Sequence, residues 1–198
     1  DFPEELIATG SLNDWVDGLT GGGKIASLDV NLAADSLKVS GIPGIGSASI
    51  TIRDFEHVKG SDTADTMVGN ALANKLYGNG GNDVIDGGTG NDDIQGGTGD
   101  DVLKGGTGND SLSGGDGADR IDGGTGNDTI NAGNGNDVML ASVGNDTCTF
   151  GSGYDTIDYS GLGQSIRLVR GGTVDKGSQG KDTFTDFYES IKASTIRF

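Results

Sequence analysis

Residues 87–113 read GGTGNDDIQGGTGDDVLKGGTGNDSLS, which is one nonapeptide written three times with small changes. Each copy opens with Gly-Gly-Thr-Gly, carries Asp at its sixth position and has an aliphatic residue at its eighth position. The same frame runs without insertion or deletion over residues 60–158 and gives eleven nonapeptides. Asp occupies the sixth position in ten of them, and the eighth position is apolar in all eleven. A period of nine that persists over half of the chain predicts a solenoid of stacked repeats.

The glycine and proline contents separate this pattern from other glycine-rich sequences. The chain has 39 glycines and 2 prolines among 198 residues, whereas collagen needs glycine at every third position and abundant proline. Glycines at the first, second and fourth positions allow positive φ and so predict a tight turn. The seventh to ninth positions, such as Val102, Leu103 and Lys104, predict a very short strand with one inward side chain. Two repeats make a coil of eighteen residues, and one coil buries so little apolar surface that coils must stack.

The acidic charge of the chain is concentrated in the repeats. The net charge is −17, and residues 60–158 contain 17 Asp, no Glu and 3 basic residues. Such a surface repels nucleic acids and anionic membranes, so we expect neither a nucleic-acid partner nor membrane insertion. A disordered acidic tail would not keep the apolar positions so regular. The charge density therefore indicates a partner that is a cation.

Stacking of coils brings the sixth-position carboxylates of repeats n and n+2 close together. At one strand spacing, ~4.8 Å, two carboxylates repel by roughly 3 kcal/mol at an effective dielectric constant of ~20. A divalent ion between successive turns reverses the sign of this interaction. The available donors are carboxylates and backbone carbonyls, a hard oxygen set that suits calcium. Zinc prefers His and Cys, of which the chain has one each.

The nonapeptide resembles GGxGxDxUx, the repeat of the RTX (repeats-in-toxin) proteins, in which U is an apolar residue. The resemblance covers residues 60–158 and is strongest over residues 87–128. It implies an all-β fold, a right-handed parallel β-roll with β-rich capping segments on both sides. It also implies calcium in the turns, held by sixth-position Asp side chains and turn carbonyls of two stacked repeats. The carboxylate ligands so implied are Asp65, Asp83, Asp92, Asp101, Asp110, Asp119, Asp128, Asp137, Asp146 and Asp155. The carbonyl ligands are Gly88, Gly90, Gly97, Gly99, Gly106, Gly108, Gly115, Gly117, Gly124, Gly126, Gly133 and Gly135.

Pairing repeat n with repeat n+2 sorts the sixth positions into two columns. One column contains Asp65, Asp83, Asp101, Asp119, Asp137 and Asp155, and the other contains Asn74, Asp92, Asp110, Asp128 and Asp146. These columns predict about seven calcium ions between Asp83 and Asp155, and up to about nine if the positions at Asp65 and Asn74 also bind. Seven calcium ions add a charge of +14 and bring the chain from −17 to about −3.

The two flanks, residues 1–59 and 159–198, are predicted to be β-rich caps on either side of the roll. They also resemble each other, because DFEHVKGS at residues 54–61 is similar to DFYESIKAS at residues 186–194. This duplication favours a longer protein of alternating units. Caps that cover the open ends of a solenoid are the simpler interpretation.

Residues outside the repeat pattern give no recognisable catalytic motif. His57 lies in a predicted capping strand, so a structural or surface role is expected for it. Cys148 lies at an inward position and is expected to be a small buried apolar residue, and one cysteine cannot form an internal disulfide. Trp15 and Tyr154 are predicted to be cap or core aromatics. Residues 18–25 nearly spell a phosphate-binding loop, but they end in Ile instead of Ser or Thr. We therefore expect no enzyme activity.

The favoured function is a calcium-binding module of a secreted or cell-surface bacterial protein, as the family resemblance implies, which folds on calcium binding after export. One alternative is an adhesive or spacer segment of a large surface protein, whose partners would be further copies of the module or a carbohydrate ligand on a cell surface. Another is the C-terminal secretion module of an exported enzyme, with the tail of residues 184–198 as an export signal.

Overall fold

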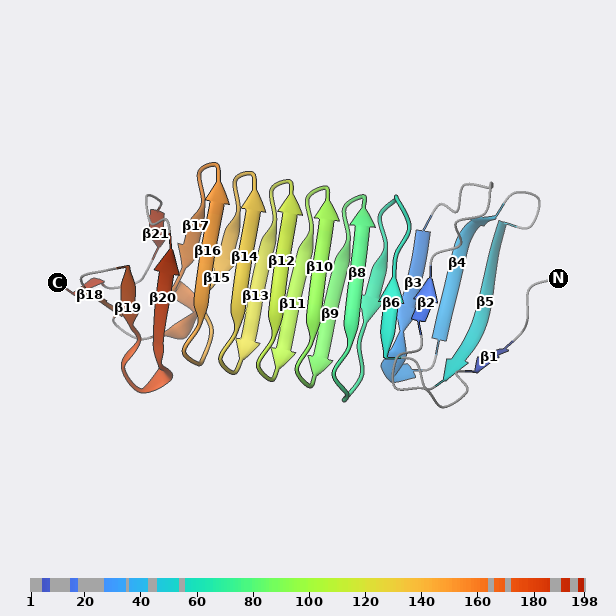
Figure 1. Ribbon diagram of the computed structural model, residues 1–198, viewed down its shortest axis with the longest axis horizontal. Helices are drawn as coiled ribbons and strands as arrows, with labels where there is room; N and C mark the ends of the chain where they lie inside the picture. The colour runs from blue at the N-terminus through green and yellow to red at the C-terminus, as the bar shows by residue number, and fades with distance from the viewer. Residues whose placement is uncertain are drawn as a thin grey trace.

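Parallel strands stacked along one axis make up most of the molecule (Figure 1). The computed structural model describes residues 5–7, 15–17, 27–34, 36–42, 46–53, 56–163, 166–169, 172–185, 190–192 and 196–197. Within these residues the chain is all-β apart from three short 3-10 turns, η1 (Leu32–Ala34), η2 (Ser160–Leu162) and η3 (Gly177–Gln179). The strands alternate between two sheets and form a parallel β-solenoid of about six turns. The all-β, parallel solenoid expected from the repeat is confirmed.

Each of the two sheets has 11 strands in the described part of the chain. The first sheet contains, in spatial order, β1 (Glu5–Ile7), β5 (Gly46–Arg53), β4 (Ser36–Ile42), β3 (Ser27–Asn31), β7 (Thr66–Val68), β9 (Val84–Thr89), β11 (Val102–Thr107), β13 (Arg120–Thr125), β15 (Val138–Leu140), β17 (Thr156–Asp158) and β21 (Ser190–Lys192). The second contains β2 (Trp15–Asp17), β6 (His57–Lys59), β8 (Lys75–Gly80), β10 (Asp93–Thr98), β12 (Ser111–Asp116), β14 (Thr129–Asn134), β16 (Thr147–Ser152), β20 (Lys181–Thr185), β19 (Thr173–Asp175), β18 (Ile166–Val169) and β22 (Ile196–Arg197).

A register of eighteen residues joins each coil to the next. Leu103 of β11 pairs with Ile85 of β9, and Leu112 of β12 pairs with Ile94 of β10. These ladders are parallel, and each strand pairs with the equivalent strand of the repeat two places along the sequence. The stacking of repeat n on repeat n+2, inferred from the sequence, is therefore confirmed.

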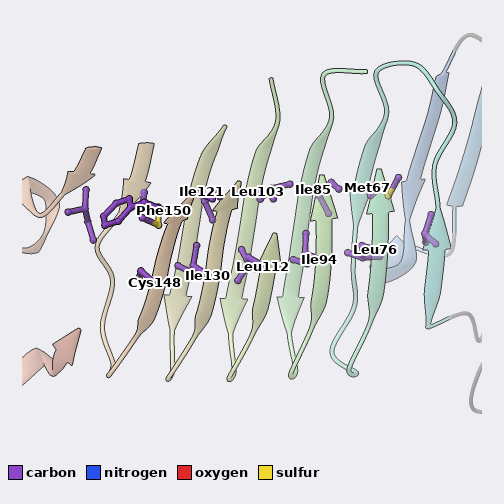
Figure 2. Close-up of a cluster of buried hydrophobic side chains, with 14 of the residues drawn as sticks. Met67, Leu76, Ile85, Ile94, Leu103, Leu112, Ile121, Ile130, Cys148 and Phe150 are labelled. Carbon is purple, nitrogen blue, oxygen red and sulfur yellow. The ribbon is translucent and has the colours of Figure 1, made fainter. Parts of the chain in front are cut away.

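Within the repeats, two facing rows of eighth-position side chains form most of the apolar core (Figure 2). Each member of these rows is at most 3% exposed, and the residues are Met67, Leu76, Ile85, Ile94, Leu103, Leu112, Ile121, Ile130, Met139, Cys148 and Ile157. Full burial of an aliphatic side chain contributes about 1.5–3 kcal/mol. One coil contributes only two such side chains, which is too little to order eighteen residues, so the core exists only as a stack.

The strands in the middle of the roll are longer than the sequence predicts. β9 and β11 each have six residues and run from the seventh position of one repeat to the third position of the next. The prediction of a three-residue strand is therefore wrong for these coils. Because inward and outward side chains alternate along a strand, the first position of the next repeat also faces the interior.

First-position glycines are needed for space and not for backbone angle, which corrects the prediction of positive φ there. A Cβ on Gly105 would lie 2.5 Å from Oδ2 of Asp110, the sixth residue of the same repeat. Positive φ occurs instead at the second and fourth positions, as at Gly106 (110°) and Gly108 (141°). Gly105 therefore leaves room for the carboxylate, while Gly106 and Gly108 form the turn.

The stack continues past residue 158, into the segment predicted to be a cap. β20 pairs in parallel with β16 and places Phe184 opposite Cys148, 36 residues away in sequence. The Phe184 ring also stacks on Phe150, with ring centroids 5.7 Å apart. β20 therefore occupies the position of one more strand of the roll.

Residues 177–185, GSQGKDTFT, fit the nonapeptide frame with Asp182 at the sixth position and Phe184 at the eighth. Gly180, at the fourth position, has a φ of 114° and lies against Gly144 of the preceding coil, as the other fourth-position glycines do. The C-terminal flank, predicted only as a β-rich cap, therefore contains a unit that fits the repeat. Residues 159–176, which contain η2, β18 and β19, do not follow the nonapeptide pattern. They separate this unit from the other repeats, so the period of nine is interrupted in the sequence.

The N-terminal flank adds β3 to one sheet through β7 and β6 to the other through β8, both in parallel. Strands β3, β4 and β5 form an antiparallel meander. Some segments discussed in the sequence lie outside the described residues. They are the glycine-rich stretch at residues 18–25, the segments 54–55 and 186–189 of the duplicated flank sequence, and residues 193–195 and 198 of the tail. In the described part of the chain, no helix is both long and apolar enough to cross a membrane.

Of the four single residues considered in the sequence, His57 and Cys148 lie where they are predicted to lie. His57 is buried in β6, and Cys148 is buried in β16 as a free thiol. Tyr154 is 85% exposed in a turn, so its predicted cap or core role is wrong. The side chain of Trp15, a residue of β2, lies outside the described part of the chain.

We expect Leu103→Ala to lower the free energy of unfolding by about 2–5 kcal/mol, because it leaves a cavity between stacked coils. Val102→Ala is the matched control, since the Val102 side chain is 42% exposed and should cost less than about 1 kcal/mol. Equilibrium urea unfolding at a fixed ion concentration measures both. Equal losses for the two variants would contradict the assignment of the eighth position to the core.

Candidate metal centre

The sixth-position side chains lie buried where each turn enters its strand. Their exposed fractions are 3% or less, and the residues are Asp65, Asn74, Asp83, Asp92, Asp101, Asp110, Asp119, Asp128, Asp137, Asp146 and Asp155. The eighteen-residue register stacks them in the two columns predicted from the sequence, and Asp182 extends the second column beyond Asp146.

One oxygen of each interior carboxylate links adjacent coils. The backbone N–H of Asp83 donates to Oδ1 of Asp101 at 2.7 Å, and the N–H of Asp101 donates to Oδ1 of Asp119 at 2.9 Å. The second column repeats the pattern, with the N–H of Asp92 donating to Oδ1 of Asp110 at 2.8 Å. The Oδ1 atoms are therefore satisfied by the fold itself.

The second oxygen has no such partner in the interior of the columns. Within the described residues, a buried Oδ2 atom without a hydrogen bond occurs at Asp83, Asp92, Asp101, Asp110, Asp119, Asp128 and Asp137. Buried polar groups in proteins are nearly always paired, and a buried charge without a partner is costly. A row of such atoms indicates that a cation belongs beside them.

The electrostatics of the columns support the same conclusion. Burial is the main cause that raises the pKa of Asp83, Asp92 and Asp128 to about 7, and nearby carboxylates, including at least one stacked neighbour in each case, raise it further. The hydrogen bond from the backbone N–H acts in the opposite direction and only partly offsets the effect of burial. Asp119 and Asp137 have pKa values raised to about 6 by the same causes. Without a cation, Asp83, Asp92 and Asp128 are therefore only about half ionised at pH 7.

Backbone carbonyls of the turns face the gap between coils. The carbonyl oxygen of Gly88 lies 2.0 Å from where a Cβ on Gly106 would be, and that of Gly90 lies 1.6 Å from a Cβ on Gly108. The same arrangement recurs up both edges of the roll, so glycines predicted as carbonyl ligands line the gap. These glycines are Gly88, Gly90, Gly97, Gly99, Gly106, Gly108, Gly115, Gly117, Gly126, Gly133 and Gly135. Gly124, also predicted as a carbonyl ligand, has Ser142 instead of a glycine at the equivalent position of the next coil.

This donor set fits calcium. In the part of the chain that the structure describes, no three His, Cys, Asp or Glu side chains converge on one point. A bound ion would therefore combine carboxylate and carbonyl oxygens, the hard donors that calcium takes in adaptable numbers. His57 in β6 and Cys148 in β16 are buried far apart in the stack, so the nitrogen and sulfur ligands typical of zinc are not brought together.

The ends of both columns differ from the interior, because their side chains find partners within the chain. Oδ2 of Asp65 accepts a hydrogen bond of 2.6 Å from the backbone N–H of Ser61. Asn74 accepts from the N–H of Asn70 and donates to the carbonyl of Glu56. Asn74, which replaces Asp at the sixth position, and Asp65, whose repeat has Thr63 instead of glycine at the fourth position, thus both find partners within the fold.

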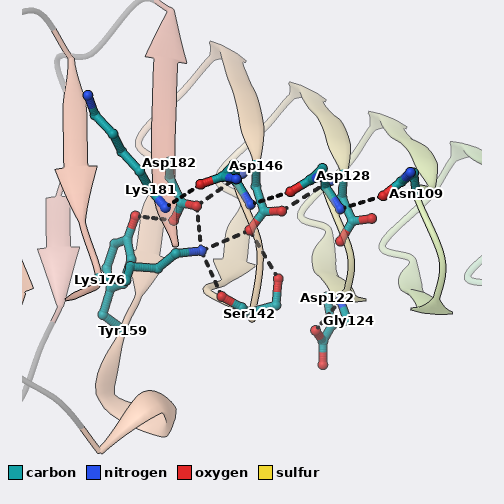
Figure 3. Close-up of polar contacts among 12 residues, drawn as sticks. Asn109, Asp122, Gly124, Asp128, Ser142, Asp146, Tyr159, Lys176, Lys181 and Asp182 are labelled. Carbon is teal, nitrogen blue, oxygen red and sulfur yellow. Dashed lines mark hydrogen bonds and ion pairs between the residues drawn. The ribbon is translucent and has the colours of Figure 1, made fainter. Parts of the chain in front are cut away.

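Asp146 and Asp155 lie at the C-terminal ends of the two columns. Oδ2 of Asp146 accepts a hydrogen bond of 3.0 Å from Nζ of Lys176, a partner that the sequence analysis did not anticipate (Figure 3). Asp155 accepts from the N–H of Asp137 at 2.8 Å through Oδ1. The stretch of unpaired Oδ2 atoms described above thus ends before Asp146 in the second column.

The raised pKa values predict how the metal-free chain responds to acid. Because an Asp in an unfolded chain has a pKa of ~3.9, the folded chain binds more protons than the unfolded chain between about pH 4 and pH 7. The stability of the metal-free fold is therefore expected to increase as pH falls from 7 towards 4.5, and to be lost as pH rises through 6 to 7. Far-UV circular dichroism in divalent-free buffer measures this. A β-sheet signal that weakens on mild acidification would contradict the prediction.

Comparison with known proteins identifies the repeat. Residues 59–94, 95–130 and 122–157 match the family model of the RTX calcium-binding nonapeptide repeat, which spans four copies of the repeat, and together these matches span half of the chain. No curated protein matches the chain. The matched residues are those that form the interior strands, the turn glycines and the carboxylate columns. The chain therefore belongs to the family of RTX calcium-binding nonapeptide repeat proteins.

Proposed function

We propose that residues 60–158 form a calcium-dependent folding module, which binds its ions between stacked turns and becomes ordered when it binds them. The observation that carries this proposal is the row of buried Oδ2 atoms from Asp83 to Asp137 that have no hydrogen-bond partner in the described residues. A calcium ion beside them supplies positive charge and coordination. The residues that would hold calcium are the interior sixth-position Asp side chains, together with turn carbonyls at the second and fourth positions.

Binding and folding are linked because the site requires two stacked turns. An unfolded chain has no such turns, so the free energy of binding acts as free energy of folding. At a calcium concentration ten times the dissociation constant, each ion contributes about 1.4 kcal/mol. With the proposed seven ions the sum is about 10 kcal/mol, which equals the whole stability of an ordinary domain. The transition is therefore expected to be steep in calcium concentration.

We further propose that the module belongs to a secreted or cell-surface bacterial protein, leaves the cell unfolded, and folds outside, where calcium is abundant. The array has no catalytic chemistry of its own in this proposal. Two features support an extracellular role: the number of acidic groups that need calcium, and the family match over residues 59–157.

An adhesive or spacer segment is the second candidate, and one observation favours it. The two flanks have similar sequences, as expected for a protein that alternates such segments with repeat blocks. A secretion module of an exported enzyme remains the third interpretation. The sequence of the full-length protein discriminates between these two, because further nonapeptide blocks indicate a spacer and a separate catalytic domain indicates an exported enzyme.

Far-UV circular dichroism during a calcium titration tests the proposed function. Starting from EDTA, we expect a cooperative increase in β-sheet signal with calcium and little response to magnesium, which keeps its hydration shell and strict geometry. A β-sheet signal that is complete in EDTA and unchanged by calcium would contradict calcium-dependent folding.

Asp110→Asn is expected to change stability in opposite directions with and without calcium. Removing one buried charge should stabilise the fold in EDTA, whereas losing a ligand should raise the calcium midpoint by about 1.5-fold or more, since about 1.4 kcal/mol is lost among about seven ions. Circular dichroism in both conditions measures the two effects.

Asp100→Asn is the control for this variant. Asp100 is an exposed fifth-position residue that accepts a hydrogen bond from the N–H of Ala118. Asn109 makes the equivalent bond to Asn127, so the substitution keeps the contact. We expect little change from Asp100→Asn in either condition, and a similar response from the two variants would argue against a special role for the sixth position.

A further inference from the structure

The C-terminal end of the second carboxylate column is built differently from its interior (Figure 3). Asp182 stacks on Asp146 in the register of the roll, and the backbone N–H of Asp146 donates to Oδ1 of Asp182 at 3.2 Å. The fifth position shows the same continuity, because the N–H of Lys181 donates to Oδ1 of Asn145 at 2.9 Å. Asp146 and Asp182 are therefore a carboxylate pair of the same kind as Asp110 and Asp128.

The Lys176 ammonium lies between these two carboxylates. Its side chain is fully buried, and its Nζ is 3.0 Å from Oδ2 of Asp146 and 2.5 Å from Oδ1 of Asp182. It also donates to the carbonyl oxygen of Ser142 at 2.7 Å. Two carboxylates from stacked turns and one backbone carbonyl thus surround a single positive charge.

The remaining oxygen of the pair is also satisfied. Tyr159 donates its hydroxyl to Oδ2 of Asp182 at 2.7 Å, and the hydroxyl of Ser142 lies 3.3 Å from Oδ2 of Asp146. Lys176 and Tyr159 both belong to the insertion of residues 159–176 that interrupts the repeats. In the interior, where no insertion lies over the turns, the equivalent Oδ2 atoms of Asp110 and Asp128 have no hydrogen-bond partner in the described residues.

We propose that Lys176 is a built-in cation that takes the place of a calcium ion between Asp146 and Asp182, so that the last coil of the roll closes without metal. This inference rests on the proposed calcium-dependent function for its comparison with the interior sites. The geometry around Lys176 is independent of that function, because every contact of Lys176 is made by residues of the chain itself. An ammonium fixed by three oxygen acceptors meets the need for charge compensation that a mobile ion meets elsewhere.

Two consequences separate this arrangement from an ordinary buried ion pair. The contact between β16 and β20 should persist when calcium is removed, while the contacts among β9 to β14 are lost. The position should also regain the ability to bind calcium when the ammonium is removed, because its carboxylates and carbonyl are donors that calcium prefers.

Hydrogen exchange of the whole chain in EDTA, read by mass spectrometry, tests the first consequence. We expect amides of β16 and β20 to be more protected than those of β10 and β12 in the unmodified chain. Lys176→Met keeps the length of the side chain and removes the charge, and it should speed exchange in β16 and β20 by about a hundredfold or more. Lys181→Met removes an exposed charge next to Asp182 and should leave the protection unchanged.

Equal protection of all coils in the unmodified chain, or full protection in Lys176→Met, would overturn the inference. The comparison of Lys176→Met with the unmodified chain is made without calcium, so the result for β16 and β20 does not depend on whether the interior binds calcium. Failure of the proposed function would appear separately, as no gain of protection in β9 to β14 when calcium is added.

Counting bound calcium by native mass spectrometry tests the second consequence. Lys176→Met at saturating calcium should carry one ion more than the unmodified chain, and an unchanged count would overturn the substitution of ammonium for calcium. The double variant Lys176→Met with Asp182→Asn removes the ammonium and one carboxylate together. In EDTA, amides of β16 and β20 in this double variant should exchange at least about ten times more slowly than in Lys176→Met alone. If they exchange as fast as in Lys176→Met, Lys176 acts through packing and not through charge.

Discussion

Burial of carboxylates that are stacked at one strand spacing is the constraint on which the rest of this structure depends. The same eighteen-residue register that aligns the apolar side chains also aligns the sixth-position Asp residues. The core therefore cannot form without bringing the charges together. Burial and mutual repulsion raise the pKa of these groups, so the fold by itself favours their neutral form. A cation resolves the conflict and lets the core and the columns form at neutral pH.

In a typical repeat glycine occurs at three positions, and only two of them require an unusual backbone angle. The second and fourth positions need positive φ to turn the chain. The first position lies inside the roll, and a Cβ at a glycine there, such as Gly105, would meet the Oδ2 atom of the carboxylate of the same repeat. The typical repeat is therefore rich in glycine, because two of its nine residues form the turn and a third leaves room for the carboxylate. Where Phe150 replaces glycine at the first position, its ring packs against Phe184 of the last coil.

Most of the interior of the roll could be predicted from the sequence, because it depends on local period alone. The register, the inward eighth positions and the two columns follow from nine residues repeated without gaps. The strand length was underestimated, since a glycine at the first position looks like part of a turn and not like an inward strand residue. β20 and Lys176 were missed because residues 159–176 break the period, and no short-range pattern shows that Lys176 returns to the end of a column. Asp146 was predicted to share the environment of Asp128, whereas its contact with Lys176 depends on a tertiary arrangement.

The fifth-position side chains run along the outer edge of the turns as a ladder of their own. Oδ1 of Asn91 accepts from the N–H of Asn109, and Asn127 and Asn145 continue the series until it reaches Lys181. Each interior coil thus presents the same hydrogen-bond donors and acceptors to the next coil, so the interfaces between adjacent coils are equivalent. Excision of one eighteen-residue coil, such as residues 96–113, would bring together ends that already match. Evolution can therefore lengthen or shorten such a roll in whole coils, while the unlike partners at its two ends determine where it starts and stops.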